Sequence, residues 1–294
     1  MKKTGLLGIA IGMFFLQSCE EKGVLIDFGK KEFVDTTYTA AVETPQPRNV
    51  FIEEFTGASC VNCPEGHRTI AALIKDNPDR IVSTAYHTFN AGSVFKPVHK
   101  AEGSSKYDFR DSAATQISSA IYISVSAIPA AGVDRTPLNG TSTLLIGQAQ
   151  WTNQTTNRLA VPSDANLYLT SSYDGDANLV KINVKIAYTK NISTKNVLTL
   201  GVTESKIIDA QEFSTYIDLN YEHNHVFRKC LTLPIGNAIL DAYPTKEAGR
   251  VYEYNYSFTP SGAWNLENCY IIAALSNNES GNKSVLQAAE VKLK

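Results

Sequence analysis

Two cysteines separated by two residues, Cys60 and Cys63, are the residues of this sequence whose type and spacing best suit chemistry. A buried-strand pattern over residues 50–55 precedes them, and apolar residues at helical spacing follow. The first cysteine is therefore expected at a helix N-terminus, where unpaired N–H groups and the helix dipole favour a thiolate. Such a thiolate attacks a disulfide, and the second cysteine resolves the mixed disulfide. The spacing predicts thiol–disulfide exchange, with Cys60 attacking and Cys63 resolving.

Two other uses of this cysteine pair compete with exchange. A zinc site needs four ligands, and His67 is the only further candidate nearby, so we expect no metal site and no cofactor. A structural disulfide across so short a loop adds little stability, because the entropic gain grows with loop size. Two interpretations of this position therefore remain, namely a redox-active disulfide of an enzyme and an inert structural disulfide. His67 could lower the thiolate's pKa, but the sequence favours a place on the exposed face of the helix.

The N-terminus has the features of an export signal. Lys2 and Lys3 precede an apolar run over residues 5–16, which is too short to span a membrane and is typical of a signal peptide. Leu16-Gln17-Ser18-Cys19 resembles the lipobox of bacterial lipoproteins. We therefore predict a signal peptide over residues 1–18 and a lipid anchor on Cys19. The expected location is the outer membrane.

Composition narrows the class of protein further. Removing the signal peptide leaves 294 − 18 = 276 residues, enough for two domains. The formal net charge of −2 becomes −2 − 2 = −4 without Lys2 and Lys3. This mild acidity, with no basic stripe, argues against a nucleic-acid partner. The expected partners are the outer membrane, through Cys19, and either exported protein thiols or surface ligands.

The remaining cysteines and two histidines suggest structural roles. With Cys19 acylated, four cysteines remain, and an exported protein can pair them all. A disulfide between Cys230 and Cys269 would close about forty residues and add a few kcal/mol of stability. His223 and His225 would share one face of any strand that contains both. Two histidines can begin a metal site, but a turn or an interface is the favoured role for this pair.

Hydrophobic periodicity predicts the elements that must position these residues. After a tether over 19–48, which includes a strand candidate at 38–42, the pattern over 49–162 mixes strands and helices, and that over 163–294 alternates with period two. In the first segment we expect strands at 50–55, 80–86 and 127–134 and helices at 60–76, 111–122 and 144–159. In the second we expect strands at 167–169, 180–186, 197–202, 227–233, 251–258, 270–275 and 285–293.

The first segment resembles the thioredoxin superfamily over residues 49–159. Cys60 and Cys63 match the superfamily's C-x-x-C, and Pro129 falls where it has a cis-proline facing the active-site disulfide. Glu54 falls where thioredoxins keep a buried acid that assists proton transfer to the resolving cysteine. The resemblance implies an α/β thioredoxin-like domain over 49–162. The dipeptide inside the motif and the residues before it differ from the usual ones.

Nearly all of the mature chain resembles a more specific family. Residues 53–57, 60–67, 223–228 and 285–289 are similar to the twenty-eight-kilodalton outer-membrane protein (Omp) family of lipoproteins. That resemblance implies a thioredoxin-like domain followed by an all-β immunoglobulin-like sandwich over 163–294. It also implies an alternative function, surface binding or adhesion, with the thioredoxin-like domain as a non-catalytic scaffold. Glu20 and Glu21 after the lipobox resemble a surface-export signal.

Overall fold

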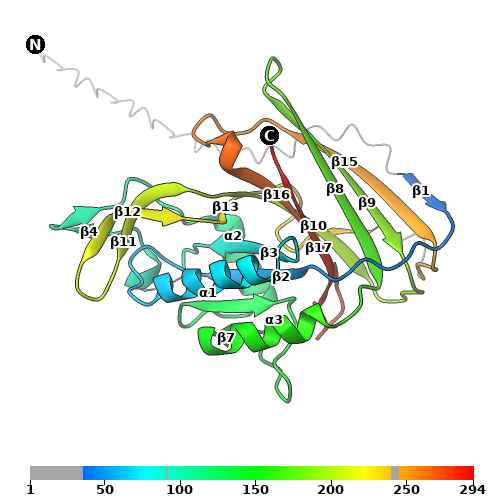
Figure 1. The fold of residues 1–294 in the computed structure, drawn as a ribbon, viewed down its shortest axis with the longest axis horizontal. Helices are drawn as coiled ribbons and strands as arrows, with labels where there is room; N and C mark the ends of the chain where they lie inside the picture. The colour runs from blue at the N-terminus through cyan, green and yellow to red at the C-terminus, as the bar shows by residue number, and fades with distance from the viewer. Residues whose placement is uncertain (1–35, 91, 240–244) are drawn as a thin grey trace, which may run out of the picture.

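A computed structural model describes residues 36–90, 92–239 and 245–294 of the chain. The predicted signal peptide and Cys19 lie outside these residues. The described chain is rich in β-structure, with seventeen strands and three α-helices. Its two larger sheets and the helices beside them can be followed in Figure 1. No helix in the described ranges is long and apolar enough to cross a membrane.

One nine-stranded sheet runs through both halves of the chain. Its strands β2, β3, β6 and β7 come from the first half, and β10, β13, β14, β16 and β17 from the second. Strand β13 joins the halves, because it pairs antiparallel with β10 and parallel with β3. The bounds are β2 (Val50–Phe55), β3 (Ile81–Tyr86), β6 (Ala130–Val133), β7 (Leu145–Gly147), β10 (Asn196–Glu204), β13 (Val226–Cys230), β14 (Asn237–Ala238), β16 (Cys269–Asn277) and β17 (Val285–Lys292).

A four-stranded sheet packs against the second-half strands of the large sheet. Its order is β1-β15-β9-β8, with β1 (Thr36–Thr39), β8 (Ala165–Asp174), β9 (Leu179–Tyr188) and β15 (Arg250–Phe258). Alternate side chains of β9, such as Val184 and Ile186, meet Leu200 of β10 and Ile271 of β16 in the largest apolar core. This period-two burial is the pattern that the sequence shows, and it produces two sheets with a core between them.

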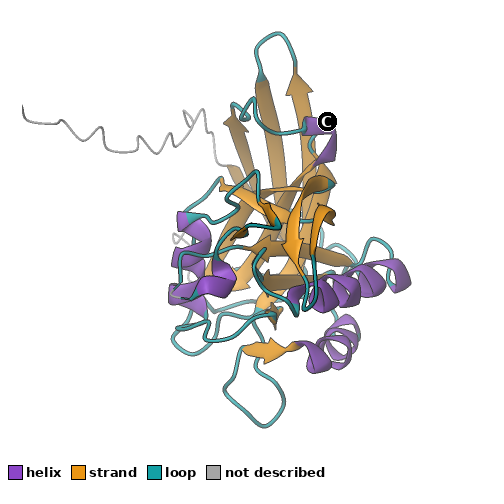
Figure 2. Cartoon of the chain, turned by 90° about the vertical axis from the view of Figure 1, so that its left-hand side faces the viewer, coloured by secondary structure: helices purple, strands orange, loops and turns teal. Residues whose placement is uncertain are grey.

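Three helices cover the first-half strands. Helix α1 (Cys63–Asp76) and helix α3 (Trp151–Leu159) pack on one face of β2, with Ile70, Leu73 and Trp151 in that core. Helix α2 (Ser112–Ile121) packs on the other face through Ile117. Figure 2 shows the helices on either side of the strands.

Local sequence explains where the helices begin and end. Asp111 caps α2 by accepting hydrogen bonds from two backbone N–H groups, and Pro64 stands in the first turn of α1. The expected helix over 144–159 is wrong in its first part, since residues 145–147 form β7, an edge strand beside β6. Leu145 and Ile146 are good strand formers that pair there, and Gly147 precedes the turn into the 3₁₀-helix η2 (Gln148–Gln150) and α3.

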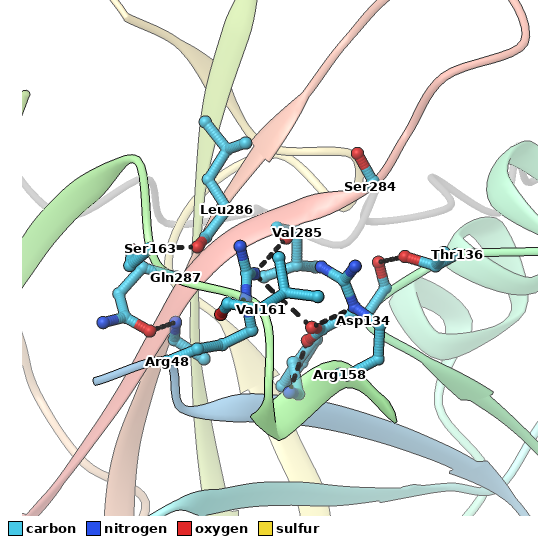
Figure 3. A network of polar contacts seen from close by, with 12 residues as sticks. Arg48, Asp134, Thr136, Arg158, Val161, Ser163, Ser284, Val285, Leu286 and Gln287 are labelled. Atoms are coloured by element: carbon cyan, nitrogen blue, oxygen red, sulfur yellow. Dashed lines mark hydrogen bonds and ion pairs between the residues drawn. The ribbon is translucent and has the colours of Figure 1, made fainter. Parts of the chain in front are cut away.

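A buried polar network ties the two halves together at the predicted boundary of 162–163. Arg48 donates to the carbonyl oxygens of Val285, Val161 and Pro162, at 2.8, 3.0 and 3.1 Å. Asp134 accepts from the Phe51 N–H and from Arg158, and the Val285 N–H donates to its backbone carbonyl. Figure 3 shows Arg48, Asp134 and Arg158 close together beside β17. The two segments of the chain are thus joined by a shared sheet and by charged hydrogen bonds.

The remaining strands form two hairpins at one end of the molecule. Strands β11 (Ile207–Glu212) and β12 (Ile217–His223) pair antiparallel, as do β4 (His99–Lys100) and β5 (Gly103–Ser104). Both hairpins lie together at the left edge of Figure 1. The sequence analysis expected neither of them. Two further 3₁₀-helices are η1 (Ser93–Phe95) and η3 (Leu266–Asn268).

Candidate functional site

Cys60 and Cys63 form a disulfide where the loop after β2 enters α1. The backbone turns tightly there, with the Cys60 N–H donating to the Gly57 carbonyl and the Cys63 N–H donating to the Cys60 carbonyl. Gly57 is required, because a Cβ at this position would lie 2.1 Å from the Val94 carbonyl oxygen. The two cysteines are only 3% and 0% exposed. The loop thus places a buried disulfide at the N-terminus of a fourteen-residue helix.

The Ile128–Pro129 peptide bond is cis, and it faces this disulfide. The Cys60 sulfur lies 3.8 Å from the Ile128 carbonyl oxygen. Pro129 also contacts Gly66 on the inner face of α1, where an added Cβ would lie 3.1 Å from the proline Cβ. The structure therefore brings Pro129 to the C-x-x-C, as the sequence comparison with thioredoxins implies.

Glu54 projects from β2 against the same face of α1. Its Oε1 atom would lie 2.8 Å from a Cβ at position 66, so the absence of a side chain on Gly66 lets the helix approach the carboxyl. Gly66 follows Cys63 by three residues, which is less than one helical turn. Glu54 is 3% exposed, and burial raises the pKa of its carboxyl well above the usual value. This carboxyl therefore holds its proton more tightly than a carboxyl in water does, and it lies within about one turn of the inner cysteine.

His67 is not on the exposed face of α1, and that expectation is corrected. Its Nε2 atom lies 2.9 Å from the Thr56 hydroxyl, and its Nδ1 atom lies 2.7 Å from the Tyr221 hydroxyl. The Nε2 atom is also 3.7 Å from Glu54 Oε1. Burial lowers the pKa of His67 to about 3, and the neighbouring histidines add to that effect. The ring is covered because β12, from the other half of the chain, packs over α1.

His223 and His225 do not share a strand face either. His223 ends β12, whereas His225 lies in the turn before β13 with a φ of 56°. The His225 carbonyl accepts from the Ala85 N–H and joins the two halves of the sheet, which is the kind of structural role that the sequence favoured. His223 and His87 both pack against the ring of Phe109. No three or more His, Cys, Asp or Glu side chains in the described residues are arranged to hold a metal ion.

The β11–β12 hairpin covers the C-x-x-C loop. The Glu212 N–H donates to the Ala58 carbonyl at 2.8 Å, and Gln211 Nε2 donates to the Cys60 carbonyl at 3.0 Å. Ala210 packs with Ala58 in a small apolar cluster. Asp209 accepts from the backbone N–H groups of residues 106 and 107, which fastens the neighbouring loop to the hairpin as well. These contacts explain why the disulfide is buried.

The expected disulfide between Cys230 and Cys269 is not formed, and this prediction is corrected. Both residues are free thiols. They lie on β13 and β16, which pair with opposite edges of β10, Cys230 opposite Gly201 and Cys269 opposite Glu204. Two strand spacings across the sheet and three residues along it separate their Cα atoms by roughly 14 Å. A disulfide needs Cα atoms within about 7 Å, so the sheet itself keeps the thiols apart.

Comparison with known proteins adds a family and a fold. The model of the outer membrane protein Omp28 family matches residues 116–294. The structure of HBP35 of Porphyromonas gingivalis is similar, with a TM-score of 0.62 and 19% identity over 85% of this chain and 77% of that chain. A protein of Agrobacterium tumefaciens gives a TM-score of 0.50 and 11% identity over 85% of this chain and 97% of that chain. At such identities the likeness concerns the fold alone.

A weaker likeness is to a domain of the outer membrane lipoprotein Omp28 from Porphyromonas gingivalis. It has a TM-score of 0.29 and 16% identity, over 45% of this chain and 89% of that one. No curated protein matches the sequence.

Proposed function

This chain belongs to the outer membrane protein Omp28 family, and on that premise we propose that it exchanges thiols and disulfides with exported proteins through Cys60 and Cys63. The outer membrane is its location, and the lipid anchor on Cys19 would hold it there. Within the proposal, residues 49–162 form a thioredoxin-like domain. Residues 163–294 form an immunoglobulin-like sandwich that shares the large sheet with it.

The observation that carries this proposal is the position of the Cys60–Cys63 disulfide between the start of α1 and the cis Ile128–Pro129 bond. A helix N-terminus stabilises the thiolate that is released when the disulfide is reduced. The Ile128 carbonyl, 3.8 Å from the Cys60 sulfur, is an acceptor that an extended substrate backbone can use. Glu54 is the acid–base group beside the inner cysteine. A purely structural bond requires none of these neighbours.

The proposed chemistry is a two-electron exchange. The Cys60 thiolate attacks one sulfur of a substrate disulfide, forming a mixed disulfide and releasing the other substrate sulfur as a thiolate. Cys63 then loses its proton to the Glu54 carboxylate and attacks the Cys60 sulfur. The Cys60–Cys63 bond forms, the second substrate thiolate leaves, and the substrate has been reduced. The reverse sequence oxidises a substrate dithiol.

Trapping the mixed disulfide tests this proposal. A Cys63→Ser variant cannot resolve the intermediate, so it should accumulate disulfide-linked exported proteins that a reductant releases. The matched variant Cys60→Ser lacks the attacking thiol and should trap none. Equal, negligible trapping by both variants would contradict exchange and leave the surface-binding alternative, in which the thioredoxin-like part is a scaffold.

A further inference from the structure

A cavity of about 200 Å³ lies between α1 and β12, beside the buried carboxyl of Glu54. Its inner wall includes the polar residues Glu54, His67, Tyr221 and His225 together with the apolar Ile70. Exposed side chains of both elements stand at its rim, namely Arg68, Glu222 and Asn224. The cavity therefore connects the acid behind the disulfide to the molecular surface, and it is large enough for several water molecules.

Two buried polar atoms on the inner wall lack partners. Glu54 Oε1 and His225 Nδ1 have no hydrogen-bond partner among the described residues. Leaving a buried donor or acceptor unsatisfied costs about 1–3 kcal/mol. Because these two atoms do not stabilise the fold, a functional role is the better explanation for them. Both atoms border the same cavity. His67 Nε2 lies 3.7 Å from Glu54 Oε1.

The protonation states suit transfer of a proton along this wall. Burial raises the pKa of Glu54 and lowers that of His67 to about 3 and that of His225 to about 4. The two imidazoles are therefore neutral, and a neutral imidazole relays a proton by releasing one from one ring nitrogen as the other nitrogen accepts one. The other titratable groups around the rings are Arg68 on α1, Tyr221, Glu222 and His223 on β12, and His87 after β3.

We infer that this cavity is the route by which Glu54 exchanges its proton with solvent, with His67 and His225 as the relay. The inference rests on the proposed function. Glu54 first gives its proton through the relay to solvent, and its carboxylate then takes the proton of the Cys63 thiol. The Cys63 thiolate attacks the Cys60 sulfur, and the substrate thiolate leaves. The hydroxyls of Thr56 and Tyr221 hold the His67 ring in position for this transfer.

The two steps of exchange can be measured separately. The reduced chain is mixed with the aromatic disulfide 5,5′-dithiobis(2-nitrobenzoate), and release of the coloured thiolate is followed in time. The first phase reports attack by Cys60, and the second reports resolution by Cys63, which needs the proton route. His225→Gly is the test variant, because the φ of 56° is one that glycine adopts freely. The same change at the exposed His99 is the control.

We expect His225→Gly to leave the first phase unchanged and to slow the second about tenfold near pH 6.5. Added imidazole should restore the second phase in this variant without affecting the wild type or His99→Gly. A second phase at the wild-type rate, or a slow one that imidazole does not restore, would overturn the proton route while leaving exchange intact. If the wild type shows no first phase, the proposed exchange fails and the route fails with it.

Discussion

We predict that removing a hydrogen bond between the β11–β12 hairpin and the C-x-x-C loop makes the disulfide accessible to solvent more often. Gln211 donates to the Cys60 carbonyl at 3.0 Å and more weakly to the Gly57 carbonyl at 3.4 Å. One well-formed hydrogen bond contributes about 1 kcal/mol net. Removing the side chain in Gln211→Ala should therefore favour opening of the hairpin by about fivefold. Because the cysteines are 3% and 0% exposed, reduction by dithiothreitol should accelerate by the same factor.

In the assay, samples of the native chain are taken from the dithiothreitol reaction at intervals and their free thiols are alkylated. The number of alkylated cysteines is then determined by mass spectrometry. Gln287→Ala is the matched control, since Gln287 is an equally buried glutamine that also bonds the backbone, at the start of β2. It should destabilise the fold to a similar degree without changing the reduction rate. Equal rates in wild type and Gln211→Ala, or equal acceleration in both variants, would refute gating by the hairpin.

Three further predictions concern the thiols, a buried ion pair and the histidines. Burial raises the pKa values of Cys230 and Cys269 to about 12, so neither should react with iodoacetamide at pH 8 until the chain is unfolded. Glu53→Gln should lower the free energy of unfolding by about 3 kcal/mol in urea titrations, because Arg135 is then buried without its carboxylate. The pKa of His223 falls from 6.5 to about 4 on folding, so protons bind the unfolded chain more tightly. Its contribution to stability is complete above pH 6.5 and is lost as the pH falls toward 4, by about 2 kcal/mol between pH 7 and pH 5.

A contradicting outcome or a control accompanies each of these predictions. Rapid labelling of a native thiol would show that the sheet does not bury the cysteines. Glu65→Gln removes a carboxylate from an exposed ion pair with Arg68 and should cost less than 0.5 kcal/mol; an equal loss in Glu53→Gln would contradict the buried pair. His223→Gln should reduce the acid sensitivity of unfolding, whereas the exposed His99→Gln should not.

Local sequence patterns located the candidate site but not the hairpin that covers it. The sequence alone points to the C-x-x-C, Glu54 and Pro129, because the strand, the helix start and the proline that mark them are local features. The structure confirms the cis bond at Pro129 and the burial of Glu54. The alternation of Ile217, Leu219, Tyr221 and His223 is a strand signal that the sequence analysis left unused. Even so, no local sequence pattern predicts that β12 contacts α1, which lies about 150 residues earlier.

The errors have long-range causes as well. The pattern of α1 alone shows a polar position at His67 and so predicts an exposed helix face, but Thr56, and Tyr221 of β12, cover the ring. The even number of cysteines left after Cys19 predicts a disulfide between Cys230 and Cys269, whereas the strand order puts β10 between them. Both errors concern the neighbours of a strand. These neighbours are set by long-range pairing, in which β13 joins the two halves of the chain.

The reduction potential of the Cys60–Cys63 bond tests thiol–disulfide exchange most directly. It is measured by equilibrating the native chain in glutathione or dithiothreitol redox buffers and quantifying the disulfide at each ratio. Exchange proteins lie between about −270 and −120 mV, and we predict a value in that range. A potential below about −300 mV, with resistance to glutathione, would identify an inert structural bond and contradict the proposed function.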